Sequence, residues 1–208
     1  MKIYFVRHGE SEANLLGEFS NRGIRHGLTP KGRQQAAALA ESLKRFSVDL
    51  IYSSPLLRAT QTAEIVATHL GLAYSVTDAL REYDCGVLEG KSDAASWQIY
   101  YAILDDWLER SQWERRIDGG ESFTDMQSRF VPLIDQIVRK YHTTDTRIVL
   151  IAHGGLYRCM LPLVLRNITF AFARSHPIDN TSYILGESHG AALVCREWCG
   201  QALDPRSE

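Results

Sequence analysis

The hydrophobic residues of the chain fall into short continuous runs, separated by longer segments in which they recur every three or four positions. Continuous runs at 2–6, 49–53 and 147–152 predict buried strands, and a shorter run at 73–76 predicts a fourth. Continuous apolar strands separated by helices are typical of a mostly parallel sheet that helices cover on both faces. The pattern therefore predicts an α/β fold around one central sheet.

The helical segments of the first half begin at residues that commonly cap helices. Thr29-Pro30 places a capping hydroxyl before a proline at the first helical position, and predicts a helix over 29–46. Ser54-Pro55 repeats this signature and predicts a helix that runs to about Leu70 and stops at Gly71. Each helix would cover part of the predicted sheet.

The second half of the chain continues the alternation. Ser122 with Asp125 resembles a capping box and predicts a helix that runs to about Tyr141. The remaining predicted elements are a helix over 93–112, a helix from Gly154 to about Leu165, and a hairpin of 181–186 and 191–198 around Ser188-His189-Gly190. The segment 77–92 follows no regular pattern, and functional residues often lie in such segments.

The composition is that of an ordinary globular protein and argues against several classes of partner. The 208 residues, 45% of them hydrophobic and 23% charged, predict a single domain over 1–208. A net charge of −2 provides no strong field for nucleic acid or an anionic membrane. Since no run approaches the ~18 apolar residues of a membrane span and no signal peptide is evident, we expect no membrane partner.

The cysteines suggest a reducing compartment. None of Cys85, Cys159, Cys195 and Cys199 forms a C-x-x-C pair, so we expect free thiols and neither a bound metal nor a disulfide framework. The expected location is therefore the cytoplasm. The sequence does not determine the oligomeric state, and a homodimer is one assembly that it allows.

Two of the predicted strands end in a histidine followed by glycine. The run IYFVRHGE ends in Arg7-His8-Gly9, and the run IVLIAHGG ends in His153-Gly154-Gly155. If both strands are central and parallel, both imidazoles emerge at the edge of the sheet where ligands bind. The glycines would let the backbone turn sharply and a ligand approach closely. Two histidines in matching contexts indicate a site, whereas one alone would usually be structural.

An arginine belongs to the same edge. Arg58 lies in the first turn of the helix that Ser54-Pro55 would open, where a cation is disfavoured by a few tenths to ~1 kcal/mol. A partner anion would explain this position. The helix N-terminus, Arg58 and Arg7 together would form a site for a doubly charged phosphoryl group.

The expected site also needs a proton donor. Glu82 lies in the irregular stretch LREYDCGVLEG, and the residues alone do not choose between it and its neighbours Asp84 and Glu89. Two imidazoles, two guanidinium groups and one carboxyl group suit phosphoryl transfer through a covalent intermediate. Fixed cations can stabilise the charge of the transferred group, so no magnesium or other cofactor is expected.

At this point a family resemblance becomes visible. Its motifs, in chain order, are RHGES with Asn14 close behind, LTPKGRQQA, SSPLLRATQTA, LREYDCGVLEG, GGES and AHGG. Over roughly residues 2 to 160 the chain resembles the histidine phosphatase superfamily, also called the phosphoglycerate mutase-like family. The resemblance implies a three-layer α/β/α sandwich, which agrees with the predicted sheet.

The resemblance also implies a role for each residue of the site. His8 would be the nucleophile that becomes phosphohistidine, and Glu82 would protonate the leaving oxygen and later activate water. The residues that would bind the phosphoryl group are Arg7, Arg58, His153 and Asn14. Those that would line the outer pocket are Ser11, Glu121 and Ser122.

Two departures from the family pattern bear on the reaction. Leu88 stands where many relatives carry a tryptophan, and Cys85 and Val87 are also atypical, so the pocket shape there is expected to differ. The chain also looks short beside cofactor-dependent mutases, which carry extra sequence around the substrate. With 77–122 as a shorter substrate-capping region, a phosphoenzyme would be open to water, which favours a phosphatase.

Several functions remain as alternatives. The first is a metal-independent phosphomonoesterase acting on a small phosphorylated metabolite. The second is a phosphoglycerate mutase. The third is an inactive module that binds a phospho-ligand or a protein. A metallohydrolase using His8, Glu10 and His153 is disfavoured by the paired arginines. An aromatic stripe could cover the pocket, although such a stripe is more often core: Trp97, Tyr100, Tyr101 and Trp107. Sugar phosphates, phosphoglycerates, phosphoserine and a cobalamin-pathway nucleotide phosphate are not distinguished as substrates.

Overall fold

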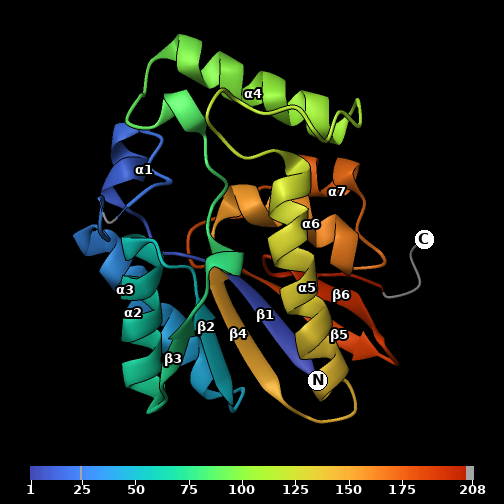
Figure 1. The fold of residues 1–208 in the computed structure, drawn as a ribbon. Coiled ribbons are helices and arrows are strands. Elements are labelled where there is room, and N and C mark those ends of the chain that lie inside the picture. The colour runs from blue at the N-terminus through green and yellow to red at the C-terminus, as the bar shows by residue number, and fades with distance from the viewer. Residues whose placement is uncertain (24, 205–208) are drawn as a thin grey trace.

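Seven strands form one sheet at the centre of the molecule, in the order β3-β2-β4-β1-β5-β6-β7 (Figure 1). The computed structural model describes residues 1–23 and 25–204. The strands are β1 (Lys2–Arg7), β2 (Leu50–Ser53), β3 (Tyr74–Val76), β4 (Arg147–Ala152), β5 (Tyr183–His189), β6 (Ala192–Trp198) and β7 (Gln201–Ala202). The four strands predicted from continuous apolar runs are confirmed as β1 to β4.

The sheet has a parallel and an antiparallel part. Strands β3, β2, β4 and β1 are all parallel, and β1 pairs with β4 in a register that sets Arg7 opposite Ala152. On the other side of β1, strands β5, β6 and β7 pair antiparallel, and β5 and β6 form the predicted hairpin. The expected parallel sheet is therefore confirmed for the half that carries both His-Gly strand ends.

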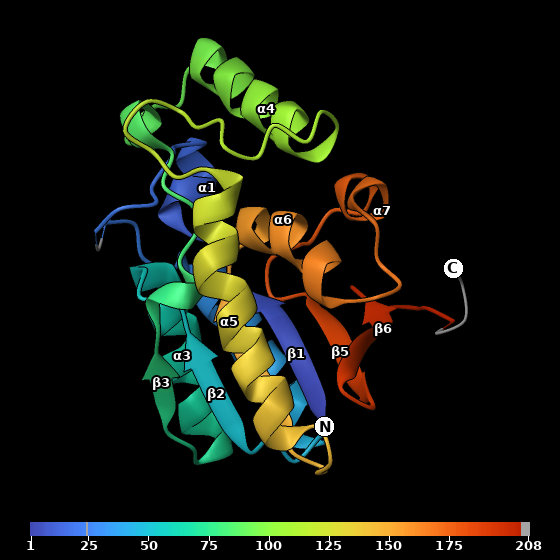
Figure 2. The ribbon, with the colours of Figure 1, turned by 45° about the vertical axis from the view of Figure 1, so that its right-hand side comes forward.

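The helices cover both faces of the sheet, and the expected three-layer α/β/α arrangement is confirmed (Figures 1 and 2). The α-helices are α1 (Glu12–Leu16), α2 (Pro30–Lys44), α3 (Leu57–Leu70), α4 (Ala94–Leu108), α5 (Phe123–Tyr141), α6 (Gly154–Val164) and α7 (Phe170–Ser175). Two short 3₁₀ helices, η1 (Asp78–Leu80) and η2 (Gly86–Leu88), lie in the segment expected to be irregular. The sequence pattern did not predict α1 and α7, because five or six residues are too few for a clear periodicity.

Strand β1 illustrates why the sheet is buried on both sides. Successive side chains of a strand point to opposite faces. Tyr4 and Val6 belong to the core beneath α2 and α3, whereas Ile3 and Phe5 belong to the core beneath α5 and α6. All four residues are buried, which is the burial that a continuous apolar run requires.

Of the three helix starts predicted from a capping residue, two are confirmed and one is wrong. The Thr29 hydroxyl caps α2 before Pro30, and Ser122 forms a capping box with Asp125 at the start of α5. The Ser54-Pro55 start is wrong, because α3 begins at Leu57 and its capping residue makes no side-chain hydrogen bond.

Helix α4 lies beyond the carboxyl ends of the parallel strands (Figures 1 and 2). It comes from the segment expected to cap the substrate, and its Trp107 is buried in the main core. None of the helices in residues 1–23 and 25–204 is long and apolar enough to cross a membrane.

Candidate active site

The two histidines lie side by side at the carboxyl edge of the sheet. His8 follows β1 and His153 follows β4, and the backbone N–H of His8 donates to the carbonyl of Ala152 at 3.0 Å. Their ring centroids are 5.1 Å apart, and both residues are buried. The prediction that both imidazoles emerge at one edge is confirmed, since adjacent parallel strands end at the same level.

The hydrogen bonds of His8 fix which nitrogen carries its proton. Nδ1 lies 2.6 Å from the carbonyl oxygen of Gly9, which can only accept, so Nδ1 is the protonated nitrogen. Nε2 accepts a hydrogen bond from Nε of Arg58 at 3.1 Å. Burial, followed by the charges of Arg58 and Arg7, holds the pKa of His8 well below its usual value. His8 is thus a neutral imidazole whose Nε2 lone pair faces a guanidinium group.

Arg58 is held in place by a loop that sequence reasoning did not single out. Its NH1 donates to the Ser20 carbonyl at 2.6 Å, and its NH2 donates to Oδ1 of Asn21 at 3.3 Å. Burial lowers the pKa of Arg58 to about 10, so the side chain still carries its charge at neutral pH. No spacing in the chain connects residues 20 and 21 with Arg58, so the fold alone reveals this support.

His153 has one bonded and one unbonded nitrogen. Its Nε2 lies 2.7 Å from Oγ of Ser54, which also accepts a hydrogen bond from the backbone N–H of Leu56. A hydroxyl can accept two hydrogen bonds and donate one, so Ser54 can also donate to Nε2, and we assign the proton of the neutral ring to Nδ1, where a ligand could accept it. Among the described residues, Nδ1 has no hydrogen-bond partner although it is buried. Ser54 thus orients His153, and Nδ1–H remains a donor for a ligand.

Glu82 lies against the start of α6. Its Oε2 accepts from the backbone N–H of Gly155 at 2.9 Å, and its Oε1 accepts from the N–H of Tyr83 at 3.2 Å. Burial raises the pKa of Glu82 above its usual value, although the charge of Arg58 and the backbone donors act in the opposite direction. A carboxyl group with a raised pKa can hold a proton that it later transfers.

The other two acidic candidates are bonded elsewhere. Asp84 pairs with Arg22 at 2.8 Å and accepts from the N–H of Gly86 at 2.7 Å. Glu89 accepts hydrogen bonds from the backbone N–H groups of Asn21 and Arg22. Of the three carboxyl groups between which the sequence could not choose, Glu82 is the one that lines the pocket beside His8.

Arg7 and Asn14 both border the same pocket. NH1 of Arg7 donates to the Ile178 carbonyl at 2.7 Å, while its buried Nε has no partner among the described residues. Oδ1 of Asn14 accepts from the N–H of Ser11 at 3.1 Å and from Nδ2 of Asn180 at 3.4 Å. Because Oδ1 is occupied, the Asn14 group that can serve a ligand is its amide NH₂.

The three residues expected to line the outer pocket have structural partners instead. Ser11 and Ser122 are buried N-caps of α1 and α5. Glu121 accepts from the N–H of Asp84 at 2.9 Å and pairs with Nε of Arg129 at the same distance. None of these residues lines either of the two pockets that border His8.

The glycines beside the histidines make room for the protein itself. A Cβ on Gly9 would lie 2.5 Å from the backbone oxygen of Gly32, so the loop after β1 could not pack against α2. A Cβ on Gly155 would lie 2.8 Å from Oε2 of Glu82. These two glycines were expected to let a ligand approach closely. In the structure the group that approaches each of them is part of the protein.

Two adjoining pockets border His8. We call them the Arg58 pocket, with a volume of about 140 Å³, and the Arg158 pocket, of about 220 Å³. They share four lining residues, Arg7, His8, Trp97 and Tyr100. Trp97, Tyr100 and Tyr101 of α4 form what we call the aromatic wall, so three residues of the predicted aromatic stripe line a pocket and Trp107 is core.

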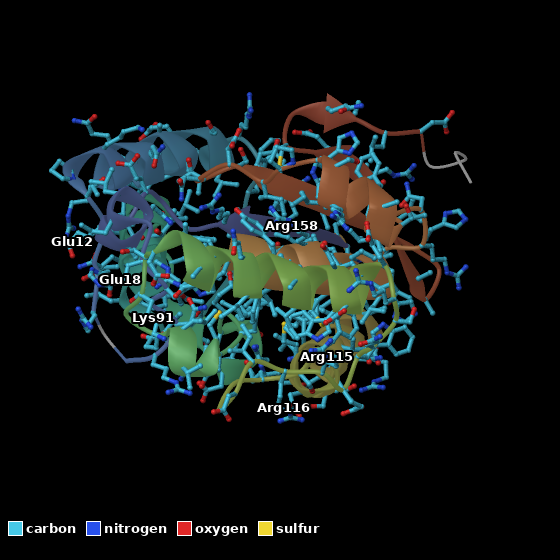
Figure 3. The ribbon with its side chains drawn as sticks, turned by 90° about the horizontal axis from the view of Figure 1, so that it is seen from above. Glu12, Glu18, Lys91, Arg115, Arg116 and Arg158 are labelled. Carbon is cyan, nitrogen blue, oxygen red and sulfur yellow. The ribbon has the colours of Figure 1, made fainter. Side chains whose placement is uncertain are left out.

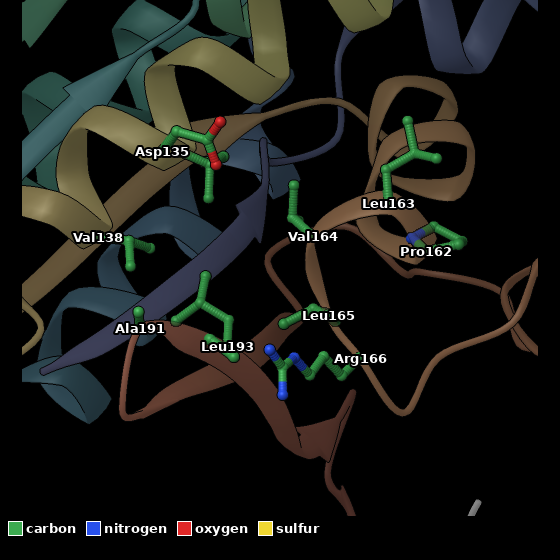
Figure 4. Close-up of a pocket in the computed structure, with 11 residues that line it drawn as sticks. Asp135, Val138, Pro162, Leu163, Val164, Leu165, Arg166, Ala191 and Leu193 are labelled. Carbon is green, nitrogen blue, oxygen red and sulfur yellow. The ribbon is translucent and has the colours of Figure 1, made fainter.

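Another cavity of about 220 Å³ shows that size does not identify a site (Figure 4). It lies between the end of α6, helix α5 and the β5–β6 hairpin. Its charged lining residues are Asp135 and Arg166, and the others are aliphatic or proline. It contains no histidine and none of the residues singled out from the sequence.

The residues proposed for a metallohydrolase do not converge on a metal. The Glu10 carboxylate bonds to Nζ of Lys31 at 2.8 Å and to Oγ1 of Thr29 at 2.9 Å. Over the part of the chain that the structure describes, no group of three or more His, Cys, Asp or Glu side chains could hold a metal ion.

Comparison with known proteins identifies relatives. The family model described as histidine phosphatase superfamily (branch 1) matches residues 3–200. Phosphoserine phosphatase 1 of Hydrogenobacter thermophilus is 31% identical over 183 residues, which cover 88% of this chain and 84% of the relative. The bifunctional 6-phosphofructo-2-kinase/fructose-2,6-bisphosphatase 1 of Mus musculus is 33% identical over 168 residues, which cover 78% of this chain but 32% of the relative.

Among solved structures, mycobacterial glucosyl-3-phosphoglycerate phosphatase in complex with VO3 is similar in fold along almost the whole chain. The match has a TM-score of 0.79, covers 97% of this chain and 99% of that chain, and has 27% identity. This relative and the phosphoserine phosphatase are named as phosphatases of small phosphorylated metabolites.

Proposed function

Because the chain belongs to the histidine phosphatase superfamily, we propose that it is a metal-independent phosphomonoesterase that acts on a small phosphorylated metabolite through a phosphohistidine at His8. The observation that carries the proposal is the hydrogen bonding of His8. Nδ1–H is bound to the Gly9 carbonyl, and Nε2 keeps a lone pair beside Arg58 in a buried pocket. A neutral, oriented imidazole next to fixed cations suits attack on a phosphorus atom.

In the first step, Nε2 of His8 attacks phosphorus while the ester P–O bond breaks. The proton of Glu82 passes to the leaving oxygen, so the alcohol departs neutral. Arg58 and Arg7, with Nδ1–H of His153 and the Asn14 amide, donate to the phosphoryl oxygens. We call these four residues and His8 the phosphate cradle. Arg58 transfers its Nε–H bond from Nε2 to the phosphoryl group.

In the second step, the Glu82 carboxylate takes a proton from water, and the water oxygen attacks phosphorus. The P–N bond breaks, phosphate leaves, and both His8 and the protonated Glu82 are restored. Fixed guanidinium groups supply the positive charge that a metal ion supplies in other phosphoryl-transfer sites. The segment 77–122 caps this site through α4, within one domain over 1–208.

A labelling experiment tests the proposal. Brief exposure to a ³²P-labelled phosphomonoester should give an acid-labile label on the wild-type protein and on His69→Ala, whose histidine is exposed on α3. The His8→Ala variant should take up no label and lose about 10³-fold or more in turnover. Full activity of correctly folded His8→Ala would disprove the mechanism.

The same preparation distinguishes the alternatives. Hydrolysis yields free phosphate, whereas a mutase isomerises its substrate and depends on a bisphosphorylated primer. An inactive binding module would show no turnover across a panel of phosphomonoesters. A cytoplasmic location and a homodimer remain predictions from the sequence, as does the absence of nucleic-acid and membrane partners.

A further inference from the structure

One cation at the site has no hydrogen-bond or ion-pair partner among the residues that the structure describes. Arg158 belongs to α6 and is partly buried, and its Nε is inaccessible to solvent without a hydrogen-bond partner. In residues 1–23 and 25–204, no hydrogen bond or ion pair involves its guanidinium group. Arg7 and Arg58, by contrast, are both bound to backbone carbonyls.

The position of Arg158 follows from helical geometry. Gly154, four residues earlier, packs against the Arg7 side chain, since a Cβ there would lie 3.4 Å from Cδ of Arg7. Residues four apart share one face of a helix and are separated by about 6 Å along its axis. The backbone of Arg158 is therefore one helical turn farther from the strand ends than that of Gly154. Burial lowers the pKa of Arg7, and the neighbouring charge of Arg158 acts in the same direction.

The pocket around Arg158 is suited to the alcohol portion of a substrate. Seen from above, Arg158 lies beside α4 (Figure 3). The Arg158 pocket is bordered by the aromatic wall and, from α6, by Gly154 and Gly155, which have no side chains to fill it. Since it adjoins His8, a leaving group that extends from the phosphoryl group can enter it.

We propose that Arg158 binds an anionic group, a carboxylate or a second phosphate, on the leaving group, and so selects small phosphomonoesters with an acidic alcohol portion. This inference rests on the proposed function and narrows its substrate class. The planar fork of arginine matches either anion. The Arg158 pocket adjoins His8 and has a volume of about 220 Å³, which suits a small leaving group.

Matched substrates test the inference. 3-Phosphoglycerate and glycerol 3-phosphate share a three-carbon skeleton, but the first carries a carboxylate where the second carries a hydroxymethyl group. Glycerol 1,3-bisphosphate carries a second phosphate instead. p-Nitrophenyl phosphate reports the phosphatase reaction itself. The proteins compared are the wild type, Arg158→Gln, Arg158→Lys and the control Arg166→Gln, whose arginine lines the separate cavity of Figure 4.

The wild type should prefer at least one of the two acidic substrates to glycerol 3-phosphate by about tenfold or more in kcat/KM. Arg158→Gln should lower that value by about 10- to 100-fold, mainly through KM, and leave glycerol 3-phosphate and p-nitrophenyl phosphate within about threefold. Arg158→Lys should recover part of the loss, and Arg166→Gln should match the wild type. Whichever acidic substrate is preferred identifies the anion.

Two results would overturn the inference. The first is that the wild type hydrolyses the acidic and neutral substrates equally well. The second is that Arg158→Gln loses the same factor on every substrate, because a uniform loss would indicate a structural role for Arg158. If the wild type hydrolyses p-nitrophenyl phosphate but does not discriminate, the inference fails alone. If it does not hydrolyse p-nitrophenyl phosphate or any other ester, the proposed function fails and the inference with it.

Discussion

The phosphate cradle and the aromatic wall face the same pockets but are built differently. Most of the cradle comes from the ends of adjacent strands and the first turn of α3, and its imidazoles and guanidinium groups are mostly buried and hydrogen-bonded. The wall comes from α4 alone. It contacts the rest through Nε1 of Trp97, which donates to the Gly17 carbonyl at 3.0 Å, and through the rings of Phe19 and Tyr83, which pack against Trp97 and Tyr100. In the proposed function, the reaction thus takes place at the sheet edge, whereas the alcohol portion of the substrate meets the aromatic wall of α4 and Arg158 of α6.

Arg58→Gln should produce the largest effect, because it removes a buried charge from the cradle. We expect kcat to fall by about 10³-fold, and by a similar factor for every phosphomonoester, since all of them share the phosphoryl group. Steady-state assays on a chemically varied panel measure this. Arg33→Gln, on the exposed side of α2, is the control for loss of a charge. A loss confined to one substrate would mean that Arg58 also contributes to recognition of the alcohol portion of the substrate.

Glu82→Gln should have a smaller effect that depends on the leaving group. For alkyl phosphates we expect a loss of about 10²-fold, because the departing alkoxide must be protonated. For p-nitrophenyl phosphate the loss should be several-fold less, because nitrophenolate is a good leaving group. Equal losses on both substrates would contradict the assigned role as proton donor.

The pH dependence of kcat/KM provides a second test of the role of Glu82, with the same Glu82→Gln variant. The proposed mechanism needs neutral His8 together with protonated Glu82, and free side chains with ordinary pKa values would rarely combine these two forms. In the site, the pKa of His8 is lowered and that of Glu82 is raised, so a larger fraction of the protein holds both groups in these forms at once. The wild-type kcat/KM should fall at low pH through His8 and at higher pH through Glu82, and Glu82→Gln should lose the alkaline limb with the same substrate.

Trp97→Phe should have the smallest effect, since it keeps an aromatic ring but removes the hydrogen bond to Gly17. We expect a loss of about fivefold in kcat/KM for the best substrate, because the wall is displaced. Labelling of His8 by p-nitrophenyl phosphate should be nearly unchanged. Comparable losses on all substrates would show that displacing the wall also changes the geometry of the phosphate cradle.

Local sequence rules account for the parts of the site that lie at strand ends. The apolar runs predicted β1 and β4, and the His-Gly pairs after them placed His8 and His153 at one edge, because parallel strands end together. Arg58 could be assigned to the same edge even though its helix begins later than predicted, since a shift of a few residues leaves it in the first turn.

The rest of the site depends on long-range contacts that no local pattern encodes. Glu82 is distinguished from Asp84 and Glu89 by its partners. The Glu82 carboxyl group accepts from an N–H at the start of α6, whereas Asp84 pairs with the Arg22 side chain and Glu89 accepts from the Arg22 backbone. Ser54 looked like a helix cap, but its hydroxyl orients His153.

The sequence by itself thus determined the sheet, its ligand-binding edge and the residue types of the reaction, because short-range periodicity and strand ends govern these features. Only the tertiary structure decided the support of Arg58, the division of the aromatic stripe between wall and core, and the position of Arg158, which has no partner in the described part of the chain. Such contacts join residues far apart in the chain, and their geometry is set by packing rather than by spacing along the sequence.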